Sequence, residues 1–390
     1  MKVAATVVAG LVVFLAVEQR TGAQNPPFSS GSSGKELALN ITASGITYFD
    51  PVAMNLNPVV PGVFHFTTIN VAAGSTLKFS ERKYHGPVYF LASGDVTIAG
   101  TLDLSGENSY GSLAFTSQRV PNAGGSGGFS GGMGGYSGNP ALPGNGPGGG
   151  AAGVAGPGSE SVYGAGGTNT SNQFLVPLIG GSGGGGTYSN GSIGASGAGA
   201  ILIASSTSIV VTGLINARGG EAGSGGGAGG GGAVRLVANS ITGGGTVQVV
   251  GGSGGIAKAN GGPGMARFES NNQGGLNVTG PTTRSVPYLL NLPATGPPTI
   301  IVTSINGQTI NANPFSFPDA TISSSTPVPI VIQAQNVPVG TIAKVYVFSE
   351  AGPDQVINIG PLTGTLASST ATANITYPQG GTRGYVKATW

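Results

Sequence analysis

The chain has 390 residues, among them 75 glycines and 26 prolines, with 7% charged residues and a formal net charge of +2. Its basic residues form no runs. This excludes a protein that binds the phosphates of nucleic acid through concentrated positive charge. Disorder combines low hydrophobicity with high charge, so the hydrophobic content of 39% favours a folded protein. No cysteine is present, which excludes disulfides and thiolate metal sites. We expect no cofactor.

The N-terminus predicts export. Lys2 precedes an apolar stretch over 3–17, and small residues come before a candidate cleavage site after Ala23. This order is typical of a secretory signal peptide. The stretch is shorter than the ~20 residues that cross a bilayer. We therefore predict a signal peptide over 1–23, a linker over 24–45, and a secreted or cell-surface protein.

Four short apolar segments recur between the glycine tracts. They begin at Val88, Ala200, Val234 and Ala266, and the first three are followed by a second strand and a glycine. The small residue that ends each of the last three segments is at 204, 238 and 270, so these copies are 34 and 32 residues apart. Such periods are typical of solenoids, whose units bury their apolar faces by stacking. The sequence therefore predicts an all-β chain with a parallel β-helix, or solenoid, over 46–280.

The alignment of the copies predicts which side chains stack. The predicted columns are Phe90-Leu202-Leu236-Phe268, Asp103-Asn216-Gln248 and Tyr89-Ile201-Arg235-Arg267. The first is apolar, and the second is a polar ladder. In the third, we expect outward-facing Tyr89, Arg235 and Arg267, because aromatic and arginine side chains on a flat surface are suited to binding sugars or a partner. A solvated face is the alternative interpretation.

A glycine-rich insert, at about 108–199, interrupts the repeats. In places glycine occupies every third position, as from Gly125 to Gly134. Polyproline II has three residues per turn, so such glycines line one face and allow close packing. A compact bundle of such segments is one interpretation, and a flexible loop is the other.

Residues 297–390 differ in character, because the glycine tracts stop and short alternating strands follow. Turn signals such as Asn306-Gly307 separate these strands, and the pattern predicts a small β-sandwich. The strands and the loop 336–341 resemble immunoglobulin-like or fibronectin-type modules. That resemblance implies a fold and carries no catalytic residues.

The segment from Ala92 to Gly106, with its copies, resembles glycine-rich secreted bacterial proteins in which strand pairs alternate with polyglycine loops. This resemblance implies an extracellular location and a β-helix-like fold, and it implies no activity.

Acidic residues are scarce, and one region collects acid, base and cation types. Asp95, Asp103, Glu107 and His85 lie there and are the candidate catalytic residues. Glycoside hydrolysis requires two carboxylates, and lyases need a base beside a cation. Structural roles are the alternative, since Asp103 fits the polar column and Asp95 follows Gly94 at a predicted turn. No G-x-x-x-x-G-K-[ST] motif is present, so we expect no nucleotide binding.

These observations predict a secreted or cell-surface structural or adhesion-type protein with no evident catalytic site, and they lean against an enzyme. The alternative is a carbohydrate-active or carbohydrate-binding β-helix protein, similar to polysaccharide lyases or hydrolases. Ice binding is a third hypothesis, although regular Thr-x-Thr ladders are missing. The expected partners are extracellular polysaccharide or other envelope components. We expect no metal ion, and self-association stays open.

Overall fold

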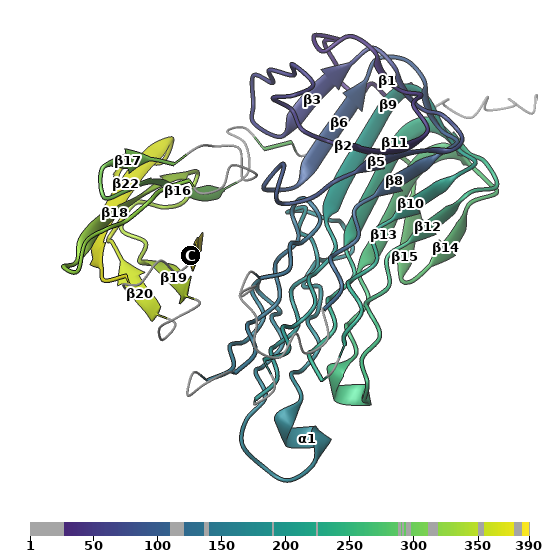
Figure 1. Ribbon diagram of the computed structural model, residues 1–390. Coiled ribbons are helices and arrows are strands. Elements are labelled where there is room, and N and C mark those ends of the chain that lie inside the picture. The colour runs from purple at the N-terminus through teal and green to yellow at the C-terminus, as the bar shows by residue number, and fades with distance from the viewer. Residues whose placement is uncertain are drawn as a thin grey trace, which may run out of the picture.

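The computed structural model describes most of the chain after the predicted signal peptide, which lies outside the described residues. The described ranges are 27–109, 121–135, 140–188, 191–223, 225–287, 290, 292–293, 298–310, 319–349, 355–377 and 384–389. Within them the protein is nearly all β, as the sequence predicted (Figure 1). The helices of these ranges, α1 (Ser159–Val162) and η1 (Ala257–Ala259), are short. No helix in the described ranges is long and apolar enough to cross a membrane.

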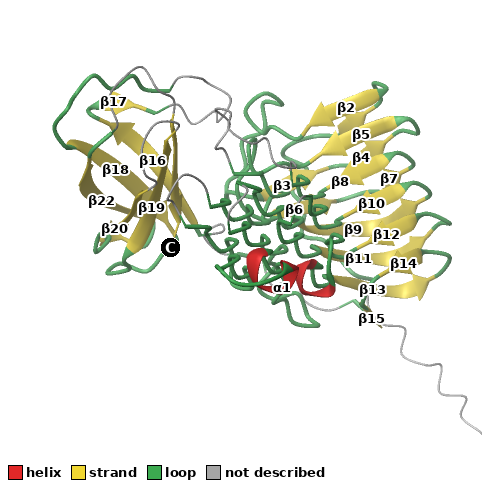
Figure 2. Ribbon diagram, turned by 60° about the horizontal axis from the view of Figure 1, so that its bottom comes forward, coloured by secondary structure: helices red, strands yellow, loops and turns green. Residues whose placement is uncertain are grey.

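Two parallel sheets form the N-terminal part of the structure, here called the parallel-sheet domain (39–285). In sheet A the strands pair in the order β1-β4-β7-β9-β11-β13-β15, and β3 and β6 join this sheet through β9. In sheet B the order is β2-β5-β8-β10-β12-β14. Successive strands of the chain pass through sheet A and then sheet B, so each such circuit adds to both sheets (Figure 2).

The strands of sheet A are β1 (Leu39–Ile41), β3 (Val63–Phe66), β4 (Ile69–Val71), β6 (Val88–Ala92), β7 (Val96–Ile98), β9 (Ala200–Val211), β11 (Ala233–Thr242), β13 (Met265–Gln273) and β15 (Thr282–Ser285). The strands of sheet B are β2 (Gly45–Tyr48), β5 (Ser75–Lys78), β8 (Thr101–Asp103), β10 (Leu214–Asn216), β12 (Thr246–Gln248) and β14 (Asn277–Thr279).

One apolar core lies between the two sheets. Its largest side chains cluster at the N-terminal end, where the rings of Phe64 and Phe66 lie 6.0 and 5.1 Å from that of Phe90. All three rings are fully buried. In sheet B one residue of every two points inward, so β8, β10 and β12 alternate between partly exposed and buried positions. In sheet A, β6 is buried on both faces, which explains its continuous apolar sequence.

Residues 27–34, expected to belong to a linker, run across successive circuits of the parallel-sheet domain. The backbone N–H of Phe28 donates to Oδ1 of Asn239 at 2.7 Å. The hydroxyls of Ser30 and Ser32 donate to the carbonyls of Ala92 and Phe66, at 2.6 and 2.7 Å. Small serine and glycine residues fit against the corner of the sheet and satisfy its backbone carbonyls. The expected linker over 24–45 is therefore ordered from residue 27 onward, and β1 falls inside it.

The glycine-rich segments form a compact bundle beside the sheets, here called the glycine bundle (123–135, 141–153, 162–168, 180–188, 192–199, 219–223, 225–231 and 251–264). Its central segment, 181–188, donates every third N–H to the same neighbour. The pairs with 192–198 are Gly181 to Ala198, Gly184 to Ala195 and Thr187 to Ser192, at 2.8, 2.9 and 3.0 Å. This period of three is that of polyproline II. For these residues, the structure agrees with the interpretation of the insert as a compact bundle and not with that of a flexible loop.

Six segments surround the central one. Its N–H groups donate to 142–145, 162–168 and 192–198, and its carbonyls accept from 129–135, 150–153 and 227–230. Backbones approach so closely that a Cβ on Gly184 would lie 2.1 Å from the carbonyl oxygen of Gly227. The glycine-rich tracts that connect the later circuits of the two parallel sheets belong to the same bundle as the insert. The sequence did not indicate this arrangement.

The C-terminal part consists of two antiparallel sheets that enclose their own core, with Ile330, Ile332, Val345 and Val347 among its buried residues. One sheet has the order β17-β16-β18-β22-β21, and the other β20-β19-β23. Their bounds are β16 (Thr299–Ile305), β17 (Gln308–Thr309), β18 (Val328–Gln335), β19 (Ala343–Ser349), β20 (Gln355–Ile359), β21 (Thr363–Thr365), β22 (Ser368–Ile375) and β23 (Gly384–Thr389).

Candidate functional site

The predicted polar column is present on the outer face of sheet B. In register, Asp103 pairs with Asn216, and Asn216 pairs with Gln248. The Asn216 amide donates to Oδ1 of Asp103 at 3.1 Å, and Nζ of Lys78 lies 2.6 Å from Oδ2. The backbone N–H of Ser105 also donates to Oδ1, at 3.0 Å. Asp103 is therefore a member of the ladder whose acceptor positions are occupied by protein groups.

The predicted apolar and outward columns are wrong at one position. The structure pairs Phe90 with Ile203, and Ile203 with Leu236, so the second copy is shifted by one residue from the expected alignment. Leu202, expected in the apolar column, instead lies beside Tyr89 in the outward one. The spacing of the copies changes accordingly, because Ser205, Ala238 and Ser270 are the paired residues.

Tyr89, Arg235 and Arg267 share a column, but the expectation that they form an exposed binding face is wrong. Their exposed fractions are 7%, 3% and 9%. An apolar cluster over the outer face of sheet A covers them, and it includes Leu175 and Leu178 from the insert. The prediction assumed that side chains on the outer face of sheet A are exposed to solvent. In the structure, a segment distant in the sequence packs on this face.

A buried ion triad takes the place of the expected binding face. Glu269, fully buried, accepts from Nε of Arg235 at 2.9 Å and from Nε of Arg267 at 2.6 Å. Arg267 also donates to the carbonyl of Gln173 at 3.2 Å, and its guanidinium lies 5.3 Å from the ring centre of Phe174. The triad thus binds the segment that covers sheet A. Sequence reasoning missed Glu269.

Asp95 holds a turn together. Its Oδ1 accepts from the hydroxyls of Thr207 and Ser208, at 2.6 and 2.8 Å. These hydrogen bonds, that of Thr207 first, lower the pKa of Asp95, while partial desolvation acts in the opposite direction. An acid whose charged form is stabilised in this way is suited to a structural role and not to proton donation.

Glu107 binds its neighbours in a similar manner. Its carboxylate receives two hydrogen bonds from Arg82, at 3.0 and 2.8 Å, and one from the N–H of Ala123 at 2.7 Å. Asp103 instead binds Lys78 and Asn216. The two carboxylates therefore belong to separate hydrogen-bond groups, and each is engaged with its own cation.

His85 lies apart from the candidate acids, because its electrostatic neighbours are Glu81 and Lys387. Desolvation by the surrounding chain lowers its pKa, Glu81 raises it, and Lys387 of β23 lowers it. None of these partners is Asp95, Asp103 or Glu107. Each of the four predicted catalytic residues therefore interacts with a different set of neighbours, and the structure does not bring them together.

The outer face of sheet B is open, in contrast to that of sheet A. Two columns of side chains cross it in register. The first is Ile46, Thr76, Thr101, Leu214, Thr246 and Asn277, and the second is Tyr48, Lys78, Asp103, Asn216, Gln248 and Thr279. All are partly or fully exposed, and no apolar cluster of the described residues covers them.

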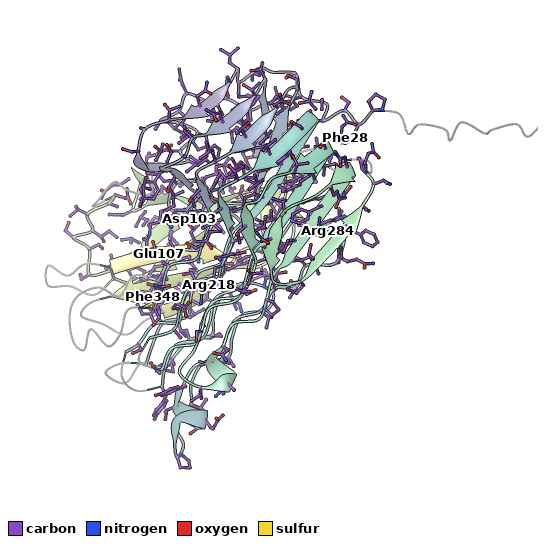
Figure 3. The ribbon with its side chains drawn as sticks, turned by 90° about the vertical axis from the view of Figure 1, so that its right-hand side faces the viewer. Phe28, Asp103, Glu107, Arg218, Arg284 and Phe348 are labelled. Carbon is purple, nitrogen blue, oxygen red and sulfur yellow. The ribbon has the colours of Figure 1, made fainter. Side chains whose placement is uncertain are left out.

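An open depression of about 360 Å³ adjoins this face. It is lined by Arg218, Val250, Gly251, Gly252, Ser253, Asn260, Gly261 and Pro263. Arg218 follows Asn216 by two residues, its carbonyl accepts from the N–H of Gly106 at 3.1 Å, and Figure 3 labels it below Asp103 and Glu107. Its guanidinium forms an ion pair with Glu221, which also accepts from the N–H of Ser253 at 2.8 Å. The alternation of 75–78 could have placed Lys78 on this face, but no sequence signal indicated the depression.

Comparisons with protein families, with curated proteins and with solved structures find no match to this chain. Among the described residues, no group of three or more histidine and acidic side chains is arranged to hold a metal ion.

Proposed function

We propose that this chain is an exported structural or adhesion-type protein of the cell surface, and that it binds its target without cleaving it. The observation that carries the proposal is a contrast within the parallel-sheet domain. Its candidate acids are engaged in structural contacts, whereas the outer face of sheet B presents an open polar surface next to a depression.

The architecture supports this role. The passage of successive strands through two parallel sheets is the arrangement expected of a parallel β-helix, and the two antiparallel sheets fit an immunoglobulin-like module. A rigid shaft with a terminal module suits a protein that displays a surface outside the cell. The predicted signal peptide and the resemblance to glycine-rich secreted bacterial proteins support the same location.

The geometry of the candidate acids supports the absence of catalysis. Hydrolysis of a glycosidic bond needs one acid that donates a proton and a second carboxylate at a fixed separation. Asp103 accepts from Lys78, Asn216 and Ser105, and Glu107 is bound by Arg82 and Ala123. Each carboxylate is thus held as an acceptor by its own set of neighbours.

A polysaccharide lyase or hydrolase is the second candidate, and one observation favours it. Lys78, Asp103 and Arg218 combine a base, an acid and a cation on the open side of sheet B. β-Elimination from a sugar acid requires a base beside a cation. In this structure, however, Lys78 and Asp103 neutralise each other at 2.6 Å.

A cleavage assay separates the two candidates. The chain from Gln24 onward is incubated with plant, algal and bacterial polysaccharides, with and without calcium, and new reducing or unsaturated ends are measured. We expect none. Cleavage that disappears in Asp103→Ala but persists in Glu160→Ala, an exposed acid of α1, would overturn the proposal and place an active site on sheet B.

A further inference from the structure

The two outer faces of the parallel-sheet domain differ in what covers them. On sheet A, residues of the column that contains Tyr89 are at most 9% exposed beneath Leu175 and Leu178. On sheet B, Tyr48 is 43% exposed and Ile46 64%. The described part of the chain thus covers one face with its own segments and leaves the other accessible to a ligand.

The open face carries groups that match a polyhydroxylated ligand. Its hydroxyls and amides act as both donors and acceptors, and they come from Thr76, Thr101, Asn216, Thr246, Gln248, Asn277 and Thr279. Tyr48 ends the second column and presents an aromatic ring with a polar tip, which suits contact with the face of a sugar.

The charges on this face cancel in pairs. Lys78 is 2.6 Å from Asp103, and Arg218 is paired with Glu221 at the depression. A polyanion would therefore meet no excess of positive charge on this face. Charge balance therefore favours a neutral ligand over an acidic one.

The dimensions of the face indicate an extended ligand. Sheet B has six strands, and neighbouring strands lie about 4.8 Å apart, so a column extends about 24 Å. Each of the strands β5, β8, β10, β12 and β14 contributes at least one hydroxyl or amide side chain to this face. A polymer that crosses the strands would therefore meet a hydrogen-bonding group on each of them, and the depression beside Val250 and Asn260 provides a place for one unit.

We propose that the outer face of sheet B and the adjoining depression at Arg218 bind an extended neutral polysaccharide. This inference rests on the proposed function, because it names the ligand of a protein taken to bind without cleaving. The second column, from Tyr48 to Thr279, forms the centre of the contact, and Arg218 and Asn260 contact the unit in the depression.

A binding experiment tests the assignment. The chain from Gln24 onward is measured on cellulose, xylan, mannan and galactan, with alginate as the acidic comparison. We expect binding to at least one neutral polymer and none to alginate. The double variant Asn216→Ala/Gln248→Ala should bind at least tenfold more weakly. Gln335→Ala, which removes an exposed amide from β18 of the C-terminal part, should bind like the wild type.

Folding is checked by circular dichroism and by the urea midpoint. Tyr48→Ala serves as a second variant should the double one misfold, and it too should weaken binding. Neutral-polymer binding that is unchanged in both variants would overturn the assignment of the face while leaving an adhesive protein in place. Binding to alginate alone, or to none of the polymers, would overturn the ligand class. Cleavage of a bound polymer would instead contradict the proposed function.

Discussion

Glu269 accepts a 2.6 Å hydrogen bond from Nε of Arg267, and neither residue is more than 9% exposed. Arg235 shares the same carboxylate oxygen at 2.9 Å. One anion therefore compensates two cations under the segment that contains Phe174. Such a group contributes to specificity by fixing where that segment packs, although removal of a single partner is costly.

Replacement of Glu269 by glutamine should destabilise the protein strongly. The change leaves two buried guanidinium groups without a counter-ion, and breaking a buried ion pair in this way costs about 3–5 kcal/mol. Urea unfolding of the variant measures the loss. Glu160→Gln, on exposed α1, is the control and should change stability by less than about 0.5 kcal/mol. A similarly small loss for Glu269→Gln would show that the triad is not a stabilising contact.

Gly184→Ala should disrupt the glycine bundle. The new Cβ would lie 2.1 Å from the carbonyl oxygen of Gly227, so backbone must move, and overpacking costs about 1–3 kcal/mol or more. Gly244→Ala is the matched control, because no atom lies within 4 Å of its Cβ position and its φ is not positive. We expect the urea midpoint to fall for the first variant and to stay within error for the second. Equal midpoints would argue against close backbone packing.

Asp95 should make stability depend on pH in the acid range. Its pKa is lowered in the folded state, chiefly by Thr207, so the charged form stabilises the fold. That contribution is complete above the ordinary aspartate pKa and is lost as the pH falls through the lower folded value. Asp95→Asn should therefore destabilise the protein more at pH 7 than at pH 2.5. Urea midpoints of the wild type and the variant at the two pH values test this. A difference between the two proteins that does not change with pH would contradict the prediction.

Asn239→Ala should release residues 27–34 from the parallel-sheet domain. The Asn239 side chain accepts from the N–H of Phe28 and donates to its carbonyl, at 2.7 and 2.9 Å. Without these hydrogen bonds, trypsin should cleave after Lys35 several times faster, as measured by mass spectrometry. Asn272→Ala, which removes an exposed amide from β13, is the control and should leave the rate unchanged. Equal rates in both variants would mean that other contacts hold the segment.

The sequence predicted the register of sheet B and that of β11 against β13 in sheet A, but it misplaced β9 by one residue, for a physical reason. In β8, β10 and β12 only the central residue is buried, and this alternation aligned Asp103, Asn216 and Gln248 correctly. β6 and the first half of β9 are buried on both faces. Without alternation, a shift of one residue leaves the apolar pattern unchanged, and Leu202 was placed in the column that Ile203 occupies.

The candidate site was less predictable, because it depends on contacts between distant segments. Burial of Arg235 and Arg267 comes from a segment around residue 175, which is 60 and 92 residues earlier in the chain. The depression at Arg218 arises where 218–221 meets 250–263. The glycine period indicated polyproline II, but every tract has the same composition, so the sequence did not specify which tracts are neighbours.

The interior of the glycine bundle consists mainly of backbone and small side chains such as Ser182 and Ala195. Segment 181–188 is held by backbone hydrogen bonds to six neighbours, and little apolar surface is removed from water there. Since the heat capacity of unfolding comes from apolar exposure, this region should unfold with a small heat-capacity change. The hydrophobic contribution weakens on cooling, whereas the cohesion of this bundle does not depend on it. The bundle should therefore keep its stability at temperatures near freezing, where the apolar core between the sheets loses part of its own.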